Sequence, residues 1–416
     1  MEIRELARLT NEAFKEFLKI GNTKLKNKIL LDIAKKIEEK KEFIIEENKK
    51  DLENGEKNNL SKALLDRLEL NEKRINGMIK ALEEIVALPD PVGKIYDMYV
   101  RPDGFKVGKM RVPIGVIGII YEARPNVTIE AAALTLKSGN ATILRGGSSA
   151  FYSNMALVSV IQEVLKENNV NQYLISYIET TDRKAVDELL VQDEYVHLII
   201  PRGGEGLIRS VVEKSRIPVL KHYKGVCHVY VDDEADLDMA LNIVINAKVQ
   251  RPAVCNAMET LLVNKEVASK FLPIALKKLQ ELGVELRVDE KTKKFYSENV
   301  KDATEEDWYA EYLDLILAVK VVDDIDEAIS HINKYGSAHT DSIITKNILK
   351  AHKFITEVDS SSVMVNASTR LSDGGVYGLG AEIGISTDRL HARGPMGLEE
   401  LTTYKWIVYG EGHIRE

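Results

Sequence analysis

The chain has 416 residues, of which 44% are hydrophobic and 29% charged, and its net charge at pH 7 is −8. This length and composition predict a globular protein with two or three domains, and the acidic balance without a basic, aromatic-rich patch argues against nucleic acid as a partner. Because no apolar run approaches about 18 residues and the first residues lack an apolar signal core, we predict no membrane span and a cytoplasmic location.

The first 88 residues are predicted to be helical, because apolar residues recur at helical spacing between Lys and Glu. Residues 98–111 then form a predicted hairpin, with Pro102-Asp103-Gly104 as a turn signal between two strand-like runs. An isolated hairpin is marginal in water, so this one is expected to lean on another part of the chain.

From residue 112 onward, strand-like and helical patterns alternate, which predicts doubly wound parallel sheets whose ligands bind at the carboxyl ends of the strands. In the first such region the expected strands are 114–121, 141–145, 173–179, 196–200 and 217–220, and the expected helices are 127–137, 150–167, 183–191 and 205–214. In the second the expected strands are 227–232, 259–263, 284–288, 313–322, 342–345 and 361–366, and the expected helices are 236–249, 265–282, 324–335 and 347–357. The polar segment 289–310 is expected to be an insertion or loop, the Gly-rich segment 372–397 a binding loop, and 402–409 a strand.

Only two cysteines occur, Cys227 and Cys255, which excludes a disulfide framework and a four-cysteine zinc site. No spacing of Cys or His predicts a metal site. Cys255 is expected in a loop between a helix and a strand, where a nucleophile can face a cleft. The alternatives are a buried core thiol and the Cys–His pair of a hydrolase, Cys255 with His339 or His222.

Three further loops follow apolar strands of the first region. Asn126 lies near the start of a helix, where its amide can stabilise an oxyanion, although it can also be a simple helix cap. The glycines of 145–149 and 203–206 would let the backbone approach a dinucleotide phosphate. Neither loop matches G-x-G-x-x-G or the Walker A pattern, so plain tight turns remain an alternative.

Together these segments resemble the aldehyde dehydrogenase superfamily and, within it, the gamma-glutamyl phosphate reductases, over essentially the whole chain. The segments that carry the resemblance are 111–118, 121–128, 144–147, 250–257, 336–343, 380–387 and 391–395. It implies an α/β fold of two doubly wound domains and a small β flap for oligomerisation. The implied boundaries are 1–97, 112–224 and 386–401 for the cofactor domain, 225–385 for the catalytic domain, and 98–111 with 402–416 for the flap.

The resemblance implies NADPH-dependent reduction of L-glutamyl 5-phosphate to L-glutamate 5-semialdehyde and phosphate, the second step of proline biosynthesis. It makes Cys255 the nucleophile that forms a thioester and Asn126 the oxyanion-binding residue. It assigns the cofactor to Arg145, Gly146, Gly147, Ser148, Gly203, Gly204 and Glu311. The residues expected to bind the anionic substrate are Arg124, Arg251, His339, Thr340 and Arg393. A homo-oligomer is expected, with glutamate 5-kinase as a candidate partner.

One departure from the superfamily concerns the general base. Hydrolytic members carry a Glu about 30 residues before the Cys, whereas residues 217–231 contain no carboxylate and the matching position is about His222. Lys221 and Lys224 are expected to lower the pKa of His222 and to weaken it as a base. An acylating dehydrogenase that uses a CoA thioester and a non-catalytic binding protein on the same scaffold remain as alternatives.

Overall fold

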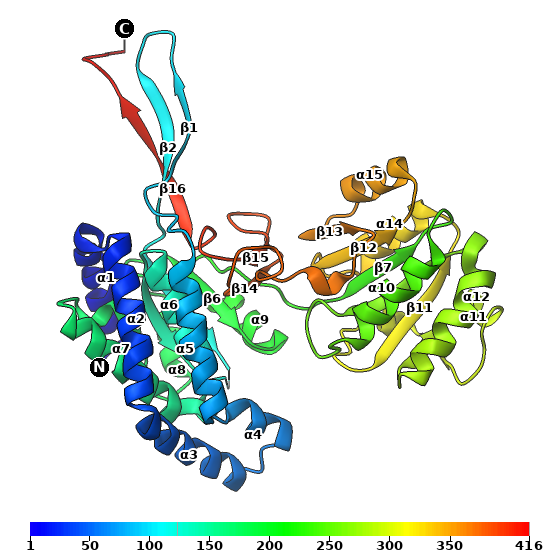
Figure 1. Ribbon diagram of the computed structural model, residues 1–416, viewed down its shortest axis with the longest axis horizontal. Helices are drawn as coiled ribbons and strands as arrows, with labels where there is room; N and C mark the ends of the chain where they lie inside the picture. Colours follow the sequence, from blue (N-terminus) through cyan, green and yellow to red (C-terminus); the bar gives the residue numbers. More distant parts are fainter. Residues whose placement is uncertain (123, 416) are drawn as a thin grey trace. The chain divides into compact units, whose positions relative to one another are not determined.

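The structure, a computed structural model, describes residues 1–122 and 124–415 apart from the side chain of Ala63, and its chain divides into two compact units (Figure 1). Unit 1 comprises Met1–Lys221, Leu379–Gly384 and Met396–Glu416, and unit 2 comprises His222–Gly378 and Ile385–Pro395. Ala123, inside the motif 121–128, and Glu416, at the end of the predicted flap, lie outside the described residues.

Five helices open unit 1, which confirms the helical prediction for the first 88 residues. They are α1 (Ile3–Ile20), α2 (Thr23–Glu39), α3 (Lys41–Lys57), α4 (Lys62–Leu68) and α5 (Glu72–Ala87). In α2 the buried residues Ile29, Ile33 and Ile37 are four positions apart. Residues at this spacing share one helix face, so the apolar pattern decides which face packs inward.

The sheet of unit 1 is parallel, with the order β5-β4-β3-β6. Its strands are β3 (Val116–Tyr121), β4 (Ala141–Arg145), β5 (Ile175–Tyr177) and β6 (Leu198–Arg202). Between them lie α6 (Asn126–Lys137), η1 (Ser148–Ala150), α7 (Phe151–Glu167), η2 (Gln172–Leu174) and α8 (Lys184–Leu189), and α9 (Glu205–Lys214) follows β6. Helices α1, α6 and α7 pack against these strands, as the alternating pattern predicts.

The strand predicted at 217–220 is wrong, because only an isolated bridge between Val219 and Ile199 forms there. Pro218 has no N–H to donate, so the segment cannot make a full ladder. Its carbonyl still accepts from the Ile199 N–H, and the Leu220 N–H donates to the Ile199 carbonyl.

The predicted hairpin forms, and it does lean on a distant segment. Strands β1 (Ile95–Val100) and β2 (Lys106–Pro113) join β16 (Thr402–Tyr409) in a three-stranded antiparallel sheet with β2 in the middle. In Figure 1 this sheet projects from the helices of unit 1. Val100, Trp406 and Val408 are exposed on it, and its role in oligomerisation stays a prediction.

The sheet of unit 2 has seven parallel strands in the order β10-β9-β11-β8-β7-β12-β13. The strands are β7 (Cys227–Val231), β8 (Met258–Asn264), β9 (Glu285–Val288), β10 (Lys301–Asp302), β11 (Ile316–Val322), β12 (Thr340–Ile344) and β13 (Ser362–Val365). The main helices are α10 (Leu237–Val249), α11 (Lys265–Glu281), α14 (Ile325–Tyr335) and α15 (Ile348–Glu357). Successive residues of β7 point to opposite faces: Val229 and Val231 pack with α10 and α11, and Tyr230 packs with α14 and α15. The sheet is therefore doubly wound, as predicted.

The segment 289–310 is more ordered than the predicted loop. It holds α12 (Glu290–Lys293), the short strand β10, and α13 (Glu305–Trp308), and β10 extends the sheet by pairing with β9. These elements are too short to show a periodic pattern of apolar residues. The sequence feature that marks such a helix is its cap, as in the capping box of Thr304 with Asp307.

The Gly-rich segment 372–397 follows η3 (Thr369–Leu371) and contains two short paired strands, β14 (Gly384–Ser386) and β15 (Gly394–Met396), where the chain passes between the units. Within the described residues, no helix combines the length and apolar character that crossing a bilayer requires.

A buried ion pair lies inside unit 2. Lys248 of α10 and Glu259 of β8 are both fully buried, with 2.7 Å between Nζ and Oε2. The N–H of Leu313 also donates to Glu259. Burial lowers the pKa of Lys248 and raises the pKa of Glu259 from 4.5 to about 7. Removing one partner would leave an uncompensated buried charge, which typically costs about 3–5 kcal/mol.

We predict that Lys248→Met lowers stability more at pH 8 than at pH 5. Because the folded-state pKa of Glu259 lies above its unfolded value, its contribution to stability is complete below about pH 4.5 and is lost as the pH rises through 7. Without Lys248 the ionised Glu259 carboxylate is less stable in the folded protein. The variant therefore loses more free energy of unfolding than the wild type when the pH is raised. Unfolding midpoints measured by calorimetry at both pH values test this.

The matched control is Lys278→Met, because Lys278 pairs with Glu281 at the surface. It should cost less than about 1 kcal/mol at either pH. The double variant Lys248→Met/Glu259→Leu should recover most of the loss. Equal destabilisation of Lys248→Met at the two pH values would contradict the prediction.

Candidate active site

Two cysteines and a histidine, Cys255, Cys227 and His339, lie at the amino edge of the sheet in unit 2. Cys255 is in the loop between α10 and β8, as predicted, while Cys227 begins β7 and His339 immediately precedes β12. Strands β8, β7 and β12 are neighbours and parallel, so their starts share one edge. Ligands of such sheets more often bind at the carboxyl edge, and sequence reasoning alone did not indicate this reversal for unit 2.

The structure brings Cys255 together with His222 and His339. Ligand atoms of the three side chains all lie within 4.8 Å of one another. The two rings meet edge to face, with 5.5 Å between centroids. Cys255 and His222 are partly exposed, whereas His339 is fully buried, and burial with the nearby His222 lowers the pKa of His339 to about 3. Cys255 therefore does lie close to both His222 and His339, which the sequence alone could not show.

Cys227 has the properties of a structural residue. It is fully buried, its thiol donates to the Cys255 carbonyl over 3.2 Å, and burial raises its pKa well above the ordinary value. A thiol in such surroundings is inert, since the thiolate is the reactive form. Of the two cysteines, only Cys255 has the exposure of a nucleophile.

Gly225 holds the Cys255 loop by close backbone packing. A Cβ at Gly225 would lie 1.8 Å from the Cys255 carbonyl oxygen. The Gly225 N–H donates to Oε1 of Glu311 over 2.8 Å. Gly225 therefore links Glu311, which is predicted to contact the cofactor, to the backbone of Cys255.

Arg370 is a residue that sequence reasoning missed. It follows β13 in η3, and its guanidinium donates to Gln250 over 2.9 Å and to the Asn256 side chain. These partners flank Cys255 on both sides. Burial and the nearby charge of Arg251 lower the pKa of Arg370, and the charge of Cys255 acts on it as well. No local motif marks Arg370, because its role arises only from contacts with a distant loop.

The other predicted substrate residues of unit 2 have different surroundings. Arg251 is exposed, Thr340 is buried with its hydroxyl 2.9 Å from His339 Nδ1, and Arg393 forms an ion pair with Asp359 over 2.7 Å. The pairing with Asp359 neutralises part of the charge that Arg393 would offer an anion.

In unit 1 three predicted loops follow the neighbouring strands β3, β4 and β6 and share the carboxyl edge of that sheet. The Gly204 N–H donates to Glu122 over 3.0 Å, which joins the loops after β3 and β6. A cavity of about 260 Å³ contains Asn126, Arg124 and Gly203. Asn126 is the first residue of α6, and its amide donates to Glu130 over 2.9 Å rather than capping the helix. Burial raises the pKa of Glu130.

The loop after β4 borders a second cavity in unit 1, of about 680 Å³, which Ser148 and Ser149 line. Gly146 packs closely there, and a Cβ at this position would lie 2.1 Å from Nδ2 of Asn154, whose side chain would have to move. Arg145 is almost buried and donates to the carbonyl of Thr181, another residue of the cavity wall. Gly147 directly precedes η1, whose start is Ser148.

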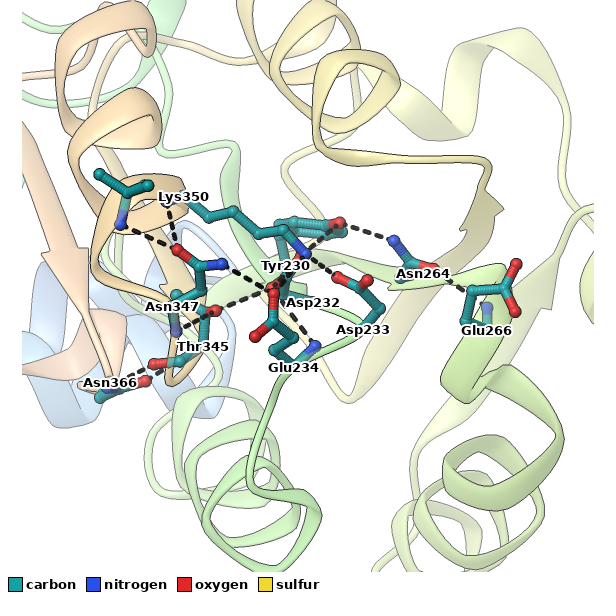
Figure 2. A network of polar contacts seen from close by, with 11 residues as sticks. Tyr230, Asp232, Asp233, Glu234, Asn264, Glu266, Thr345, Asn347, Lys350 and Asn366 are labelled. Carbon is teal, nitrogen blue, oxygen red and sulfur yellow. Dashed lines mark hydrogen bonds and ion pairs between the residues drawn. The ribbon is translucent and has the colours of Figure 1, made fainter.

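The carboxyl edge of the unit 2 sheet carries a separate polar network (Figure 2). Lys350 contacts all three consecutive acids after β7, at 3.4 Å from Asp232, 3.1 Å from Glu234, and in a short contact with Asp233. Thr345 also donates to Asp232 over 2.7 Å, and burial raises the pKa of Asp232. Lys350 already supplies the positive charge that this acidic cluster attracts. We therefore interpret the network as one that stabilises the fold.

Comparison with known proteins decides the family. The sequence model of the aldehyde dehydrogenase family matches residues 1–295 and 308–407. The chain belongs to the aldehyde dehydrogenase family. It is 60% identical to the gamma-glutamyl phosphate reductase of Thermodesulfovibrio yellowstonii over the full length of both chains, and 55% identical to that of Persephonella marina, covering 99% and 94%. The crystal structure of the Thermotoga maritima gamma-glutamyl phosphate reductase matches with a TM-score of 0.98 and 51% identity, covering both chains fully. The predicted aldehyde dehydrogenase fold and the enzyme class are confirmed.

We predict that Gly225→Ala impairs Cys255 specifically. The added methyl would collide with the Cys255 backbone and displace the thiol, and a misplacement of about 1 Å at a reacting group can cost about 100-fold in rate. The rate of Cys255 alkylation by iodoacetamide, followed by mass spectrometry, measures the effect without substrate.

Gly77→Ala is the control for this variant. A Cβ at Gly77, inside α5, meets nothing within 4 Å, so the substitution should leave the alkylation rate unchanged and stabilise the helix by about 0.5–1 kcal/mol. Wild-type reactivity in Gly225→Ala would show that the close packing does not position the thiol.

Proposed function

We propose that the chain reduces L-glutamyl 5-phosphate to L-glutamate 5-semialdehyde and phosphate with NADPH, through a thioester on Cys255. The observation that carries this proposal is the 51–60% identity, over the full length of both chains, to proteins named gamma-glutamyl phosphate reductase. The reaction is the second step of proline biosynthesis from glutamate, and we place it in the cytosol.

In the proposed reaction, the Cys255 thiolate attacks the carbonyl carbon of the acyl phosphate, and a C–S bond replaces the C–O bond to phosphate. Phosphate leaves with the electron pair of that bond. Arg370 places positive charge near the Cys255 sulfur, which favours the thiolate. The packing of Gly225 against Cys255 and the hydrogen bond from Gly225 to Glu311 hold the loop that contains Cys255.

Asn126 is assigned to the oxyanion that forms when the thiolate adds, together with the backbone N–H of Cys255. Its donating amide is oriented by Glu130, which supports this role over that of a helix cap. When bound, NADPH supplies the hydride that converts the thioester to the aldehyde. The loops with Arg145, Gly146, Gly147 and Ser148 and with Gly203 and Gly204 are assigned to its phosphates, and Glu311 to its nicotinamide ribose.

The substrate carries a phosphate and an α-carboxylate, groups that Arg binds with paired hydrogen bonds. We assign these anions to Arg251 and Arg124, with Arg370 as an addition that only the fold indicates. Arg393 stays a candidate that must exchange its contact with Asp359. His339 and Thr340 are buried, so we assign them to holding the Cys255 surroundings rather than to direct substrate contact.

The three-stranded sheet of β1, β2 and β16 is proposed as the oligomerisation flap of a homo-oligomer. Its exposed aromatic and apolar residues, among them Tyr99 and Trp406, support that role, because contiguous apolar surface marks interaction sites. Glutamate 5-kinase is the proposed upstream partner.

We predict that oxidation of glutamate 5-semialdehyde with NADP+ requires phosphate or arsenate. Water needs a positioned base to attack a thioester. At about the position of the hydrolytic Glu this chain has His222 in place of a carboxylate, and the neighbouring charges of Lys221 and Lys224 are expected to weaken it as a base. Phosphate is already a nucleophile. In phosphate-free buffer NADP+ reduction should therefore stop after the first turnover, and phosphate should restore sustained turnover whereas CoA should not.

Cys255→Ala should abolish turnover under all these conditions while NADPH still binds, and Cys227→Ala should retain it. Sustained turnover without phosphate would identify water as the acceptor. Turnover that depends on CoA would identify an acylating dehydrogenase. Either result would overturn the proposed reaction.

We predict that the enzyme uses NADPH more efficiently than NADH. Arg145 is the last residue of β4, and Ser148 and Ser149 follow it, so a 2′-phosphate at this strand end can meet a cation and hydroxyl donors. Ser148→Glu should lower kcat/KM for NADPH by about ten-fold or more, because a carboxylate facing a phosphate repels it, and should change NADH use little. Ser148→Ala is the uncharged control, and equal efficiency with both cofactors in the wild type would contradict the assignment.

A further inference from the structure

The side chains of Cys255, His222 and His339 have the composition and spacing of a zinc site. Tetrahedral Zn²⁺ binds nitrogen at about 2.0–2.1 Å and sulfur at about 2.3 Å, so its ligand atoms lie roughly 3.3–3.8 Å apart. The three ligand atoms in unit 2 are within 4.8 Å of one another, and movements of about 1 Å in side chains would close them around an ion.

Each of the two imidazoles has a hydrogen-bond partner at Nδ1, as metal-binding histidines commonly have at one ring nitrogen. His222 Nδ1 lies 2.8 Å from the carbonyl oxygen of Ile385, and His339 Nδ1 lies 2.9 Å from the Thr340 hydroxyl. A hydrogen bond of this kind fixes the ring and leaves Nε2 as the nitrogen available to a metal. His339 Nε2 is fully buried and has no hydrogen-bond partner, which is costly for a polar atom unless a ligand satisfies it.

We propose that Cys255, His222 and His339 form a reversible binding site for Zn²⁺ that shuts off the nucleophile. Thiolate and imidazole ligands select zinc over Mg²⁺ and Ca²⁺, which prefer oxygen. On binding, the Cys255 thiol gives up its proton to solvent and its sulfur electron pair bonds the metal, so the oxidation state of neither changes. The fourth position stays open for water, as in zinc sites with three protein ligands.

The site is distinct from the acidic cluster at the opposite edge of the sheet, where Lys350 occupies the centre of Asp232, Asp233 and Glu234. It arises from the active-site thiol but needs neither substrate nor cofactor. Zinc binding and the reductase reaction can therefore be tested separately, and failure of one leaves the other standing.

Titration of the reduced full-length protein with Zn²⁺ alone, followed by calorimetry, tests the proposal. We expect one ion per chain, and about 100-fold weaker binding or more in Cys255→Ala and in His222→Asn. Replacing Zn²⁺ with Co²⁺ should produce the thiolate charge-transfer and tetrahedral absorption bands, and both should be lost in Cys255→Ala.

Two variants serve as matched controls, His352→Asn on the exposed side of α15 and Asp233→Asn in the acidic cluster, and both should bind Zn²⁺ as the wild type does. Zn²⁺ should also slow Cys255 alkylation by iodoacetamide about ten-fold or more, and a chelator should reverse this, with buried Cys227 unreactive throughout. Absence of stoichiometric binding to the wild type, or unchanged affinity in Cys255→Ala and His222→Asn, would overturn the proposal. Loss of binding in Asp233→Asn alone would place the ion in the acidic cluster and overturn it as well.

Discussion

The parallel pairing of β8, β7 and β12 is the constraint on which the chemistry of unit 2 depends. Neighbouring parallel strands begin at the same edge of the sheet, so residues that are far apart in the chain lie close together there. Cys255 before β8, Cys227 at the start of β7 and His339 before β12 meet for this reason. Helices on both faces bury the strands, and this burial prevents the register from slipping.

Close backbone approach then sets the position of Cys255, the proposed nucleophile. Gly225 packs where no Cβ fits against the Cys255 carbonyl, and Gly146 in unit 1 lies close to the Asn154 side chain. In both units a glycine thus lies at a loop of the candidate site. Arg370 donates hydrogen bonds to Gln250 and Asn256, on either side of Cys255 in the loop. The sequence did not indicate this cation near Cys255.

The two sheets place their candidate functional loops at opposite ends of their strands. Unit 1 follows the general rule for doubly wound sheets, with Asn126 and the glycine turns after β3, β4 and β6. Unit 2 has the thiol cluster at the amino edge, while its carboxyl edge is closed by the ion-pair network of Lys350. A cluster of three metal-ligating side chains at the amino edge was not expected from the spacing of Cys and His, because spacing along the chain says nothing about residues from three separate elements.

The sequence by itself determined the alternating α/β pattern, the helical start, the hairpin, and the family through motifs such as 250–257, because local periodicity and contiguous motifs do not depend on distant contacts. It also singled out Cys255 over Cys227, since only one of the two lies in a loop. The tertiary structure decided the rest. Pro218 reduced a predicted strand to one bridge, β16 completed the sheet of the hairpin, and Arg370, His222 and His339 came to surround Cys255. These outcomes depend on strand order and long-range packing, which no local pattern of residues encodes.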